Sequence, residues 1–179
     1  MNRTSFKLLL LLPLLSVIMF ACEPEQPRDE PDEASASAIS MALGGFDEIV
    51  PLVERALDEA DVNKTQTICA TITADTIAKI ITLDWGSGCV GIDGKFRTGI
   101  MTIQYNGQFY QTGSTFTIGF DNFSVQGTQL DGDLRITSFA RNSQNQLFFQ
   151  VEVIDGQVIF ANGESILYET DRTYTFIEG

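Results

Sequence analysis

Apolar and polar residues alternate with a period of two over the greater part of this chain. Phe116, Ile118 and Phe120 alternate with small or polar residues, and the segments around Phe149 and Tyr174 repeat the pattern. Successive side chains of a β-strand point to opposite faces, so this alternation is typical of strands with one buried and one solvated face. No helical segments separate these strands, and a parallel sheet needs crossover helices. The chain is therefore predicted to be mainly β, with an antiparallel meander.

Turn signals recur between the alternating segments. The segments VEVIDGQVIF and VIFANGESILY are predicted to form two hairpins that share a middle strand. About eight strands, in an open sheet or a sandwich, follow from the spacing of the turns. Asn or Asp precedes Gly, a pair that favours the positive φ angles of hairpin turns, at Asp93-Gly94, Asn106-Gly107, Asp131-Gly132, Asp155-Gly156 and Asn162-Gly163.

A short helix is predicted before the strands, in GGFDEIVPLVERALDEAD. Phe46, Ile49 and Val53 recur near helical spacing and belong to one apolar stripe. Asp47 is the predicted N-cap, and Pro51 is compatible with a helix only in its first turn. The stripe is expected to pack against the sheet, and the alternative is a face that binds a partner.

The first 21 residues have the layout of a secretory signal, with two basic residues, an apolar run, and Ala21 directly before Cys22. The apolar run is too short to span a bilayer, which takes roughly 20 residues. The stretch Met19-Phe20-Ala21-Cys22 matches a bacterial lipobox. We therefore predict that residues 1–21 are removed and that Cys22 is lipidated with acyl chains such as palmitate. An ordinary signal peptide with an incidental cysteine is the alternative.

Residues 22–44 are rich in acids, prolines and small residues, a composition that cannot bury enough apolar surface to fold. They are predicted to form a tether between the lipid and the domain. The chain carries 24 acidic and 11 basic residues, a formal net charge of −13. Such a surface repels nucleic acid and anionic headgroups, so the predicted membrane partner is held through the lipid anchor alone.

The segment of residues 45–179 is long enough to bury one hydrophobic core, and it is predicted to form a single, mostly β domain. The chain stops at TYTFIEG, which has a strand pattern. This segment is interpreted either as an edge strand or as the end of a domain that is shortened at its C-terminus. A truncated copy without independent function is one hypothesis for the chain.

Two cysteines remain if Cys22 is lipidated, and they are Cys69 and Cys89. Exported proteins meet oxidising conditions in which disulfides persist, so a bridge between these two residues is predicted. The alternatives are two free thiols or a metal site. The chain has no histidine and no third thiol near this pair, which disfavours a metal.

Several short motifs follow one another in order over residues 80–132. A strand ends in an Asp-aromatic-Gly turn and leads to Gly-Cys, an Asp-Gly-Lys turn, an Arg-x-Gly strand and a Phe-Asp-Asn-Phe strand. In this order the chain resembles a group of uncharacterised Bacteroidetes lipoproteins, which implies an outer-membrane address, on the periplasmic face or the cell surface, and no established activity. The motifs are Asp84-Trp85-Gly86, Gly88-Cys89, Asp93-Gly94-Lys95, Arg97 with Gly99, and Phe120-Asp121-Asn122-Phe123.

One further motif concerns O-glycosylation. Asp75-Thr76-Ile77 fits the tripeptide pattern at which Bacteroidetes O-glycosylate exported proteins. Thr76 is therefore a candidate O-glycosylation site. The motif is short, and its chance occurrence is the alternative.

The composition argues against an enzyme. The lack of histidine excludes Ser-His-Asp and Cys-His arrangements and the usual zinc sites, and there is no phosphate-binding loop. Neither DNF nor LDGDL has the spacing of a calcium loop, so no metal or cofactor is expected. Paired carboxylates could hydrolyse glycans, but turns also favour aspartate for its bonds to the backbone. The aspartates in or beside predicted turns are Asp84, Asp93, Asp121, Asp131 and Asp133.

Four aromatic residues lie near predicted turns: Trp85, Tyr105, Phe109 and Tyr110. Aromatic rings at loop ends stack on sugars or anchor a protein partner, so these residues form a candidate binding patch. Closure of one end of the core is the alternative. The favoured function is a lipid-anchored outer-membrane β domain with a binding or structural role toward a glycan or an envelope protein. A carboxylate-dependent glycan hydrolase is the alternative.

Overall fold

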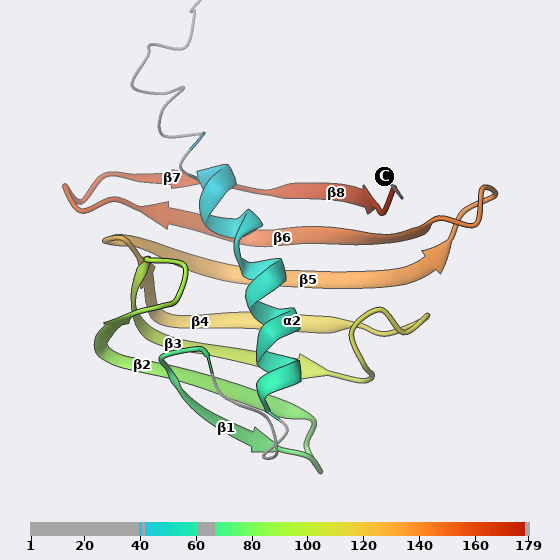
Figure 1. Cartoon of the computed structure of the whole chain (residues 1–179). Helices are drawn as coiled ribbons and strands as arrows, with labels where there is room; N and C mark the ends of the chain where they lie inside the picture. The colour runs from blue at the N-terminus through green and yellow to red at the C-terminus, as the bar shows by residue number, and fades with distance from the viewer. Residues whose placement is uncertain (1–39, 41, 61–66, 178–179) are drawn as a thin grey trace, which may run out of the picture. The chain divides into compact units, whose positions relative to one another are not determined.

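The computed structural model describes residue 40, residues 42–60 and residues 67–177 (Figure 1). The predicted signal peptide, Cys22 and most of the predicted tether lie outside the described residues. In the part of the chain that is described, no helix is long and apolar enough to cross a membrane. All described residues belong to one compact unit.

Eight strands form one antiparallel sheet among the described residues, which confirms the predicted meander (Figure 1). From β1 to β7, each strand pairs with the next one along the chain, so no crossover is needed. The last strand, β8, pairs with β6 beyond the end of β7, so these two short strands together form one edge. The strands are β1 (Thr71–Asp75), β2 (Ile80–Val90), β3 (Phe96–Tyr105), β4 (Phe116–Val125), β5 (Thr128–Arg141), β6 (Leu147–Ile159), β7 (Ser165–Leu167) and β8 (Thr170–Thr175).

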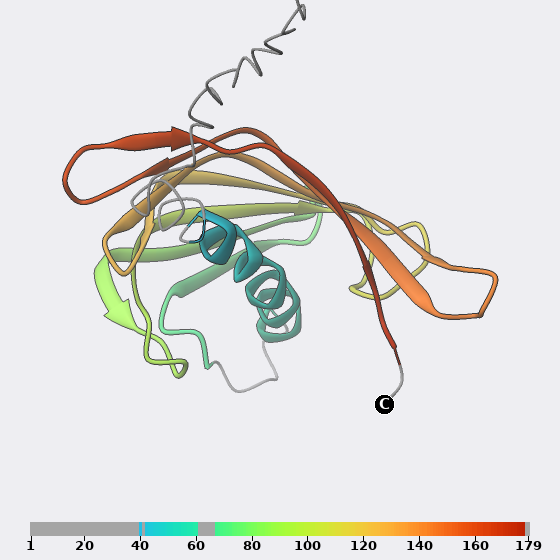
Figure 2. The same ribbon diagram turned by 90° about the horizontal axis from the view of Figure 1, so that it is seen from above.

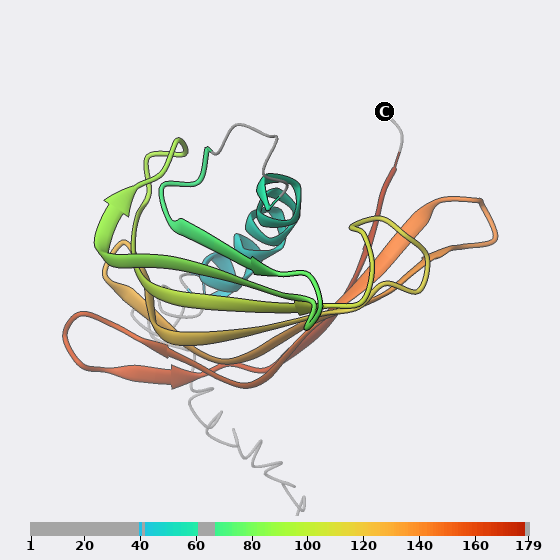
Figure 3. The same cartoon turned by 90° about the horizontal axis from the view of Figure 1, so that it is seen from below.

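The helix α2 (Ile49–Glu59) follows helical residues 42–47 and lies across the strands (Figure 1). The sheet curls around α2, so the helix lies on its concave face (Figures 2 and 3). Phe46 is 2% exposed, and Ile49 and Val53 are fully buried. The interpretation of the apolar stripe as a face that packs on the sheet is therefore confirmed.

The hydrophobic core lies between α2 and the concave face of the sheet. Because side chains alternate along a strand, every second residue points toward the helix. On β4, Phe116 and Ile118 are fully buried, whereas Asp121 is exposed. The largest fully buried side chains are Phe46, Phe116, Phe123, Phe139, Ile49, Ile81, Leu83, Met101, Ile103, Ile118, Leu130 and Leu134.

Two of the five predicted turn pairs are not turns. Asp131-Gly132 lies inside β5 and Asp155-Gly156 inside β6, where the register between the two strands shifts. Gly132 (φ 98°) opposes Asp155 (φ 49°), and a Cβ on this glycine would lie 2.7 Å from the Asp155 carbonyl oxygen. A bulge can use a residue with positive φ, as hairpin turns do, so the same dipeptide fits either. The hairpin predicted within VEVIDGQVIF is therefore wrong, because this segment is one bulged strand.

The start of α2 differs from the prediction in its cap. Pro51 is the third residue of α2, in the first turn as predicted, where its missing N–H loses no intrahelical bond. The N-cap is Glu48 and not Asp47. The Asp47 carboxylate instead accepts hydrogen bonds from Arg172 (2.8 Å) and Tyr174 (2.9 Å) on β8. This carboxylate therefore links the helix to one edge of the sheet.

Arg97 links the same end of α2 to β3. Its side chain is 5% exposed and forms an ion pair with Glu48 at 3.2 Å. The guanidinium also donates hydrogen bonds to Asp93 (2.6 and 3.0 Å), and Lys95 forms a second ion pair with Glu48. The hydrogen bonds from Arg97 hold the pKa of Asp93 well below its usual range, although partial burial opposes this shift. Removing one partner would leave a buried charge alone, so this network constrains where the helix can lie.

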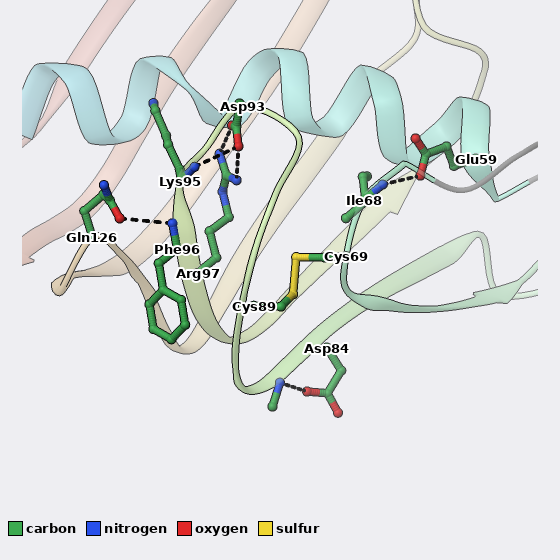
Figure 4. The surroundings of a disulfide bond; sticks show 11 residues. Glu59, Ile68, Cys69, Asp84, Cys89, Asp93, Lys95, Phe96, Arg97 and Gln126 are labelled. Atoms are coloured by element: carbon green, nitrogen blue, oxygen red, sulfur yellow. Dashed lines mark hydrogen bonds and ion pairs between the residues drawn. A yellow bond between two sulfur atoms is a disulfide. The ribbon is translucent and has the colours of Figure 1, made fainter.

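The other end of α2 is tied down by Glu59 and by a disulfide (Figure 4). Glu59 is 5% exposed, and its carboxylate accepts hydrogen bonds from the Ile68 amide (2.9 Å) and the Thr67 hydroxyl. Cys69, which follows Ile68, forms a disulfide with Cys89 of β2, and their Cα atoms are 6.1 Å apart. The predicted disulfide is confirmed, and it fixes the segment that enters the sheet.

Replacing Cys69 and Cys89 together with serine is expected to lower the free energy of unfolding by roughly 3 kcal/mol, because the unfolded chain regains the entropy of the open loop. Urea unfolding of the purified full-length protein measures this. A reducing agent should lower the midpoint of the unmodified protein to the same extent and leave that of the double variant unchanged. A midpoint of the unmodified protein that does not respond to reduction would contradict the prediction.

Candidate functional site

An open hollow with a volume of about 890 Å³ lies beside the C-terminal half of α2. Sites for small ligands have volumes of roughly 300–1,000 Å³, so the hollow is large enough for one. Three segments line it, which are α2, the β1–β2 hairpin, and the end of β3 with the loop that follows. The lining residues are Glu54, Leu57, Asp58 and Ala60; Ala74, Thr76, Lys79 and Ile81; and residues 105–111.

The hollow exists because α2 covers only the middle of the concave face. A helix is about 10 Å wide, whereas strands of 10 and 14 residues, such as β3 and β5, are roughly 33–46 Å long. On one side of α2, the β2–β3 hairpin reaches the helix through Arg97. The β1–β2 turn and the β3–β4 loop lie on the other side of α2 (Figure 1), and both contribute residues to the lining of the hollow.

Three of the four aromatic residues of the candidate patch meet at this hollow. Tyr105 ends β3, and Phe109 and Tyr110 lie in the loop after it, with ring centroids 4.9 Å apart. Phe109 also packs on the buried ring of Phe116, at 5.3 Å, whereas Tyr110 is 42% exposed. Phe109 therefore anchors the loop to the core, and Tyr110, whose ring also contacts Phe176 with centroids 5.3 Å apart, is partly exposed.

Trp85 does not line the hollow. It is 5% exposed on β2 and packs on Phe123, with ring centroids 5.2 Å apart. Trp85 belongs to the core, which was the alternative interpretation of the aromatic group. Proximity to a turn in the sequence does not distinguish a ring that closes a core from one that lines a site.

The helix contributes two carboxylates that the sequence did not single out, Glu54 and Asp58. They are one helical turn apart, a spacing that also occurs on any solvated helix face. Burial raises the pKa of Tyr110 to about 12, and the neighbouring Glu54 carboxylate adds to this shift. At neutral pH the Tyr110 phenol therefore stays protonated. Lys79 Nζ lies 5.7 Å from the centroid of the Tyr105 ring, a cation–π contact.

Two residues that line the hollow have strained backbone conformations. Lys79 has a φ of 59° and Tyr110 a φ of 65°. This region costs a residue with a Cβ roughly 1–2 kcal/mol, and Asn and Asp tolerate it best. The other described non-glycine residues with positive φ are Asn122, Gln126, Asn145 and Asp155. A lysine and a tyrosine at positions where glycine would be less strained point to a role for their side chains.

The five aspartates considered for glycan hydrolysis do not line the hollow. Asp84, Asp93 and Asp131 accept hydrogen bonds from nearby backbone N–H groups of their own turns or bulge. Asp121 and Asp133 are exposed. Within the described ranges, no group of three or more Cys, Asp or Glu side chains is placed to hold a metal ion.

Thr76 lies exposed in the β1–β2 turn, at the rim of the hollow. The Asp75 carboxylate accepts hydrogen bonds from the amides of Ile77 (2.9 Å) and Ala78 (2.8 Å), and the Ile77 side chain is 94% exposed. The turn is thus accessible, as O-glycosylation of Thr76 requires. The modification itself stays a prediction.

Comparison of the chain with models of known families, with curated proteins and with solved structures gives no match. The resemblance to Bacteroidetes lipoproteins therefore stays a prediction. The candidate site is defined by its geometry, its aromatic rings and its charges.

Lys79→Gly and Lys79→Ala both remove the side chain from Tyr105, but only glycine relieves the positive φ. The glycine variant is expected to exceed the alanine variant in free energy of unfolding by roughly 1 kcal/mol. Urea unfolding of the two variants under identical conditions measures the difference. Equal stability, or a more stable alanine variant, would show that the backbone at this position is not strained.

Proposed function

We propose that this chain is a lipid-anchored outer-membrane protein whose β domain binds a glycan in the hollow beside α2. One observation carries the proposal. Residues 105–111 bring three aromatic rings and three amide side chains to the wall of one open hollow. The strained conformations of Lys79 and Tyr110 support a binding role for the same wall.

Sugars suit such a wall because of their own chemistry. A pyranose ring has an apolar face of C–H groups and a rim of hydroxyls. Aromatic rings can stack on the apolar face. Amides can donate and accept hydrogen bonds at the rim, and carboxylates can accept them from its hydroxyls. The amides are supplied by Asn106, Gln108 and Gln111, and the carboxylates by Glu54 and Asp58.

The cellular location of the protein is proposed from its N-terminal sequence. The lipobox before Cys22 supports an anchor, and the resemblance to Bacteroidetes lipoproteins supports the outer membrane. The net charge of −13 argues against attraction to anionic headgroups or nucleic acid. The lipid is therefore proposed as the membrane contact, with the domain presented on the acidic tether to the periplasm or the exterior.

Cys22→Ala is expected to move the protein from the membrane fraction to the soluble fraction, because the thiol that carries the lipid is lost. Fractionation of cells that express the full chain, followed by immunoblotting, measures this. Cys69→Ser with Cys89→Ser is the matched control, since it removes cysteines without affecting the lipobox. If the Cys22 variant stayed as membrane-bound as the unmodified protein, the anchor would be wrong.

Glycan binding is tested with protein purified in detergent from cells that express the full chain. It is applied to an array of bacterial-envelope and dietary glycans, and the glycan that binds best is then titrated by calorimetry. Tyr110→Ala is expected to weaken binding roughly fivefold or more, because a stacked ring contributes about 1 kcal/mol.

Phe96→Ala is the matched control for the loss of an aromatic ring. Phe96 is 40% exposed, close to the 42% of Tyr110, but it lies in the β2–β3 hairpin outside the hollow. Its replacement is expected to leave the affinity unchanged. No binding across the array, or equal weakening by the two variants, would refute the hollow as a glycan site.

Hydrolysis is a second candidate function because Glu54 and Asp58 both line the hollow. Glycosidases use two carboxylates that flank the scissile bond. Incubation of the bound glycan with the protein, followed by product analysis, distinguishes the two functions. Release of shorter sugars that stops in Glu54→Gln would establish an enzyme, whereas an intact glycan supports the proposed binding role.

A further inference from the structure

The side-chain amides of Asn106 and Gln111 are oriented by the backbone of their own loop. The Oδ1 atom of Asn106 accepts a hydrogen bond from the backbone N–H of Thr115, at 2.8 Å. The Oε1 atom of Gln111 accepts one from the backbone N–H of Gln108, at 3.2 Å. A backbone N–H can only donate, so it fixes which end of each side-chain amide is the oxygen. Both amide oxygens are therefore turned toward the loop.

Gly107 allows the two amides to lie close to each other. This glycine follows Asn106 directly, and a Cβ on it would lie 3.1 Å from Oε1 of Gln111. The Gln111 side chain thus folds back against the residue next to Asn106. Both amide side chains are exposed and line the hollow, so they belong to one part of its wall.

The nitrogen atoms of these two amides are available to a ligand. Among the described residues, neither Nδ2 of Asn106 nor Nε2 of Gln111 has a hydrogen-bond partner. Each of these NH₂ groups carries two hydrogens that it can donate. This part of the wall therefore presents donors, and the ligand group that fits it best is an acceptor.

An acetamido group has the complementary acceptor. Its carbonyl oxygen has two lone pairs and no proton, so it can accept one hydrogen bond from each of the two amides. A sugar hydroxyl can accept as well, but it also has a proton to donate, and both amide oxygens already accept backbone hydrogen bonds. The methyl group of an acetamido substituent can pack on the partly exposed ring of Tyr110, which lines the same hollow.

We propose that the hollow prefers glycans that carry acetamido groups, whose carbonyl oxygen accepts hydrogen bonds from the side-chain amides of Asn106 and Gln111. This inference rests on the proposed glycan-binding function and names its ligand class. The carboxylates of acidic glycans are acceptors too, but the formal net charge of −13 opposes their approach. Glycans that carry only hydroxyls match the two donors less completely and therefore bind less tightly.

The test compares two neutral tetrasaccharides with the same linkage, N-acetylchitotetraose and cellotetraose, which differ in having an acetamido group or a hydroxyl at one position of each sugar. Protein purified in detergent from cells that express the full chain is titrated with each by calorimetry. The acetamido form is expected to bind roughly fivefold more tightly or better, the gain that an additional hydrogen bond gives.

Asn106→Asp and Gln111→Glu, made separately, test the two donors. Each variant keeps the oxygen that accepts the backbone hydrogen bond within the loop and removes only the NH₂ group. Both are therefore expected to unfold at the urea midpoint of the unmodified protein. In each variant, the affinities for the two tetrasaccharides are expected to come within roughly twofold of each other.

Gln104→Glu is the matched control, because each of the two variants adds one negative charge. Gln104 is exposed on β3 and does not line the hollow. The preference for the acetamido form is expected to persist in this variant. Equal loss of preference in the control would overturn the inference, since charge alone would then explain it. A preference that persists in both Asn106→Asp and Gln111→Glu would also overturn it, since the methyl group would then be its cause.

The remaining outcomes separate this inference from the proposed function. Equal affinity of the unmodified protein for the two tetrasaccharides, with both weakened by Tyr110→Ala, would overturn the acetamido preference and leave glycan binding in place. Tighter binding of an acidic tetrasaccharide, tetragalacturonate, would do the same, as would binding of neither neutral tetrasaccharide while another glycan binds in the hollow. Binding of no glycan at all would overturn both.

Discussion

The position of α2 across the concave face is the constraint on which the rest of the structure depends. Two neighbouring carboxylates directly before Ile49, the first residue of α2, connect this end of the helix to different strands: Asp47 to Arg172 on β8, and Glu48 to Arg97 on β3. At the other end, Glu59 accepts hydrogen bonds from the segment that leads to the disulfide. The pair of Arg97 and Glu48 is buried, whereas that of Arg172 and Asp47 is partly exposed. A buried ion pair adds little net stability compared with apolar packing, but it penalises any arrangement that separates its partners. The apolar stripe supplies most of the burial, and the Arg97–Glu48 pair restricts the orientation of the helix.

The candidate site is a consequence of that orientation. A helix that crosses the strands leaves parts of a concave face uncovered, since each strand is several times longer than the helix is wide. On the side of the β2–β3 hairpin, Arg97 and its partners reach α2. On the other side, the loop after β3 forms a wall and the polar face of α2 supplies Glu54 and Asp58. The carboxylates that line the hollow therefore come from helix residues that do not belong to the apolar stripe.

The sequence predicts the sheet, the helix and the disulfide because each depends on a local or compositional signal: a period of two, a helical stripe, and an even pair of cysteines. It does not distinguish the bulge at Gly132 and Asp155 from a turn, since Gly and Asp at positive φ are favoured in both. It groups Trp85 with Tyr105, Phe109 and Tyr110, although only the last three share a hollow. Glu54 is not identified from the sequence, because its spacing from Asp58 also occurs on any solvated helix face. Long-range placement, which joins residues of α2 to a loop after β3, has no signature in a single sequence.

The contact between Asp47 and Arg172 also bears on how the chain folds, because these residues are 125 positions apart. Hairpins between neighbouring strands can form early, since each closes a short loop. The helix precedes all of them in the chain, yet Asp47, just before its N-cap, cannot reach Arg172 until β8 has joined β6. Contacts of such high sequence separation slow the search for the native state. The helix, which is synthesised before every strand of the sheet, is thus among the last elements to acquire its final contacts. Until then, part of the apolar concave face is exposed to other chains.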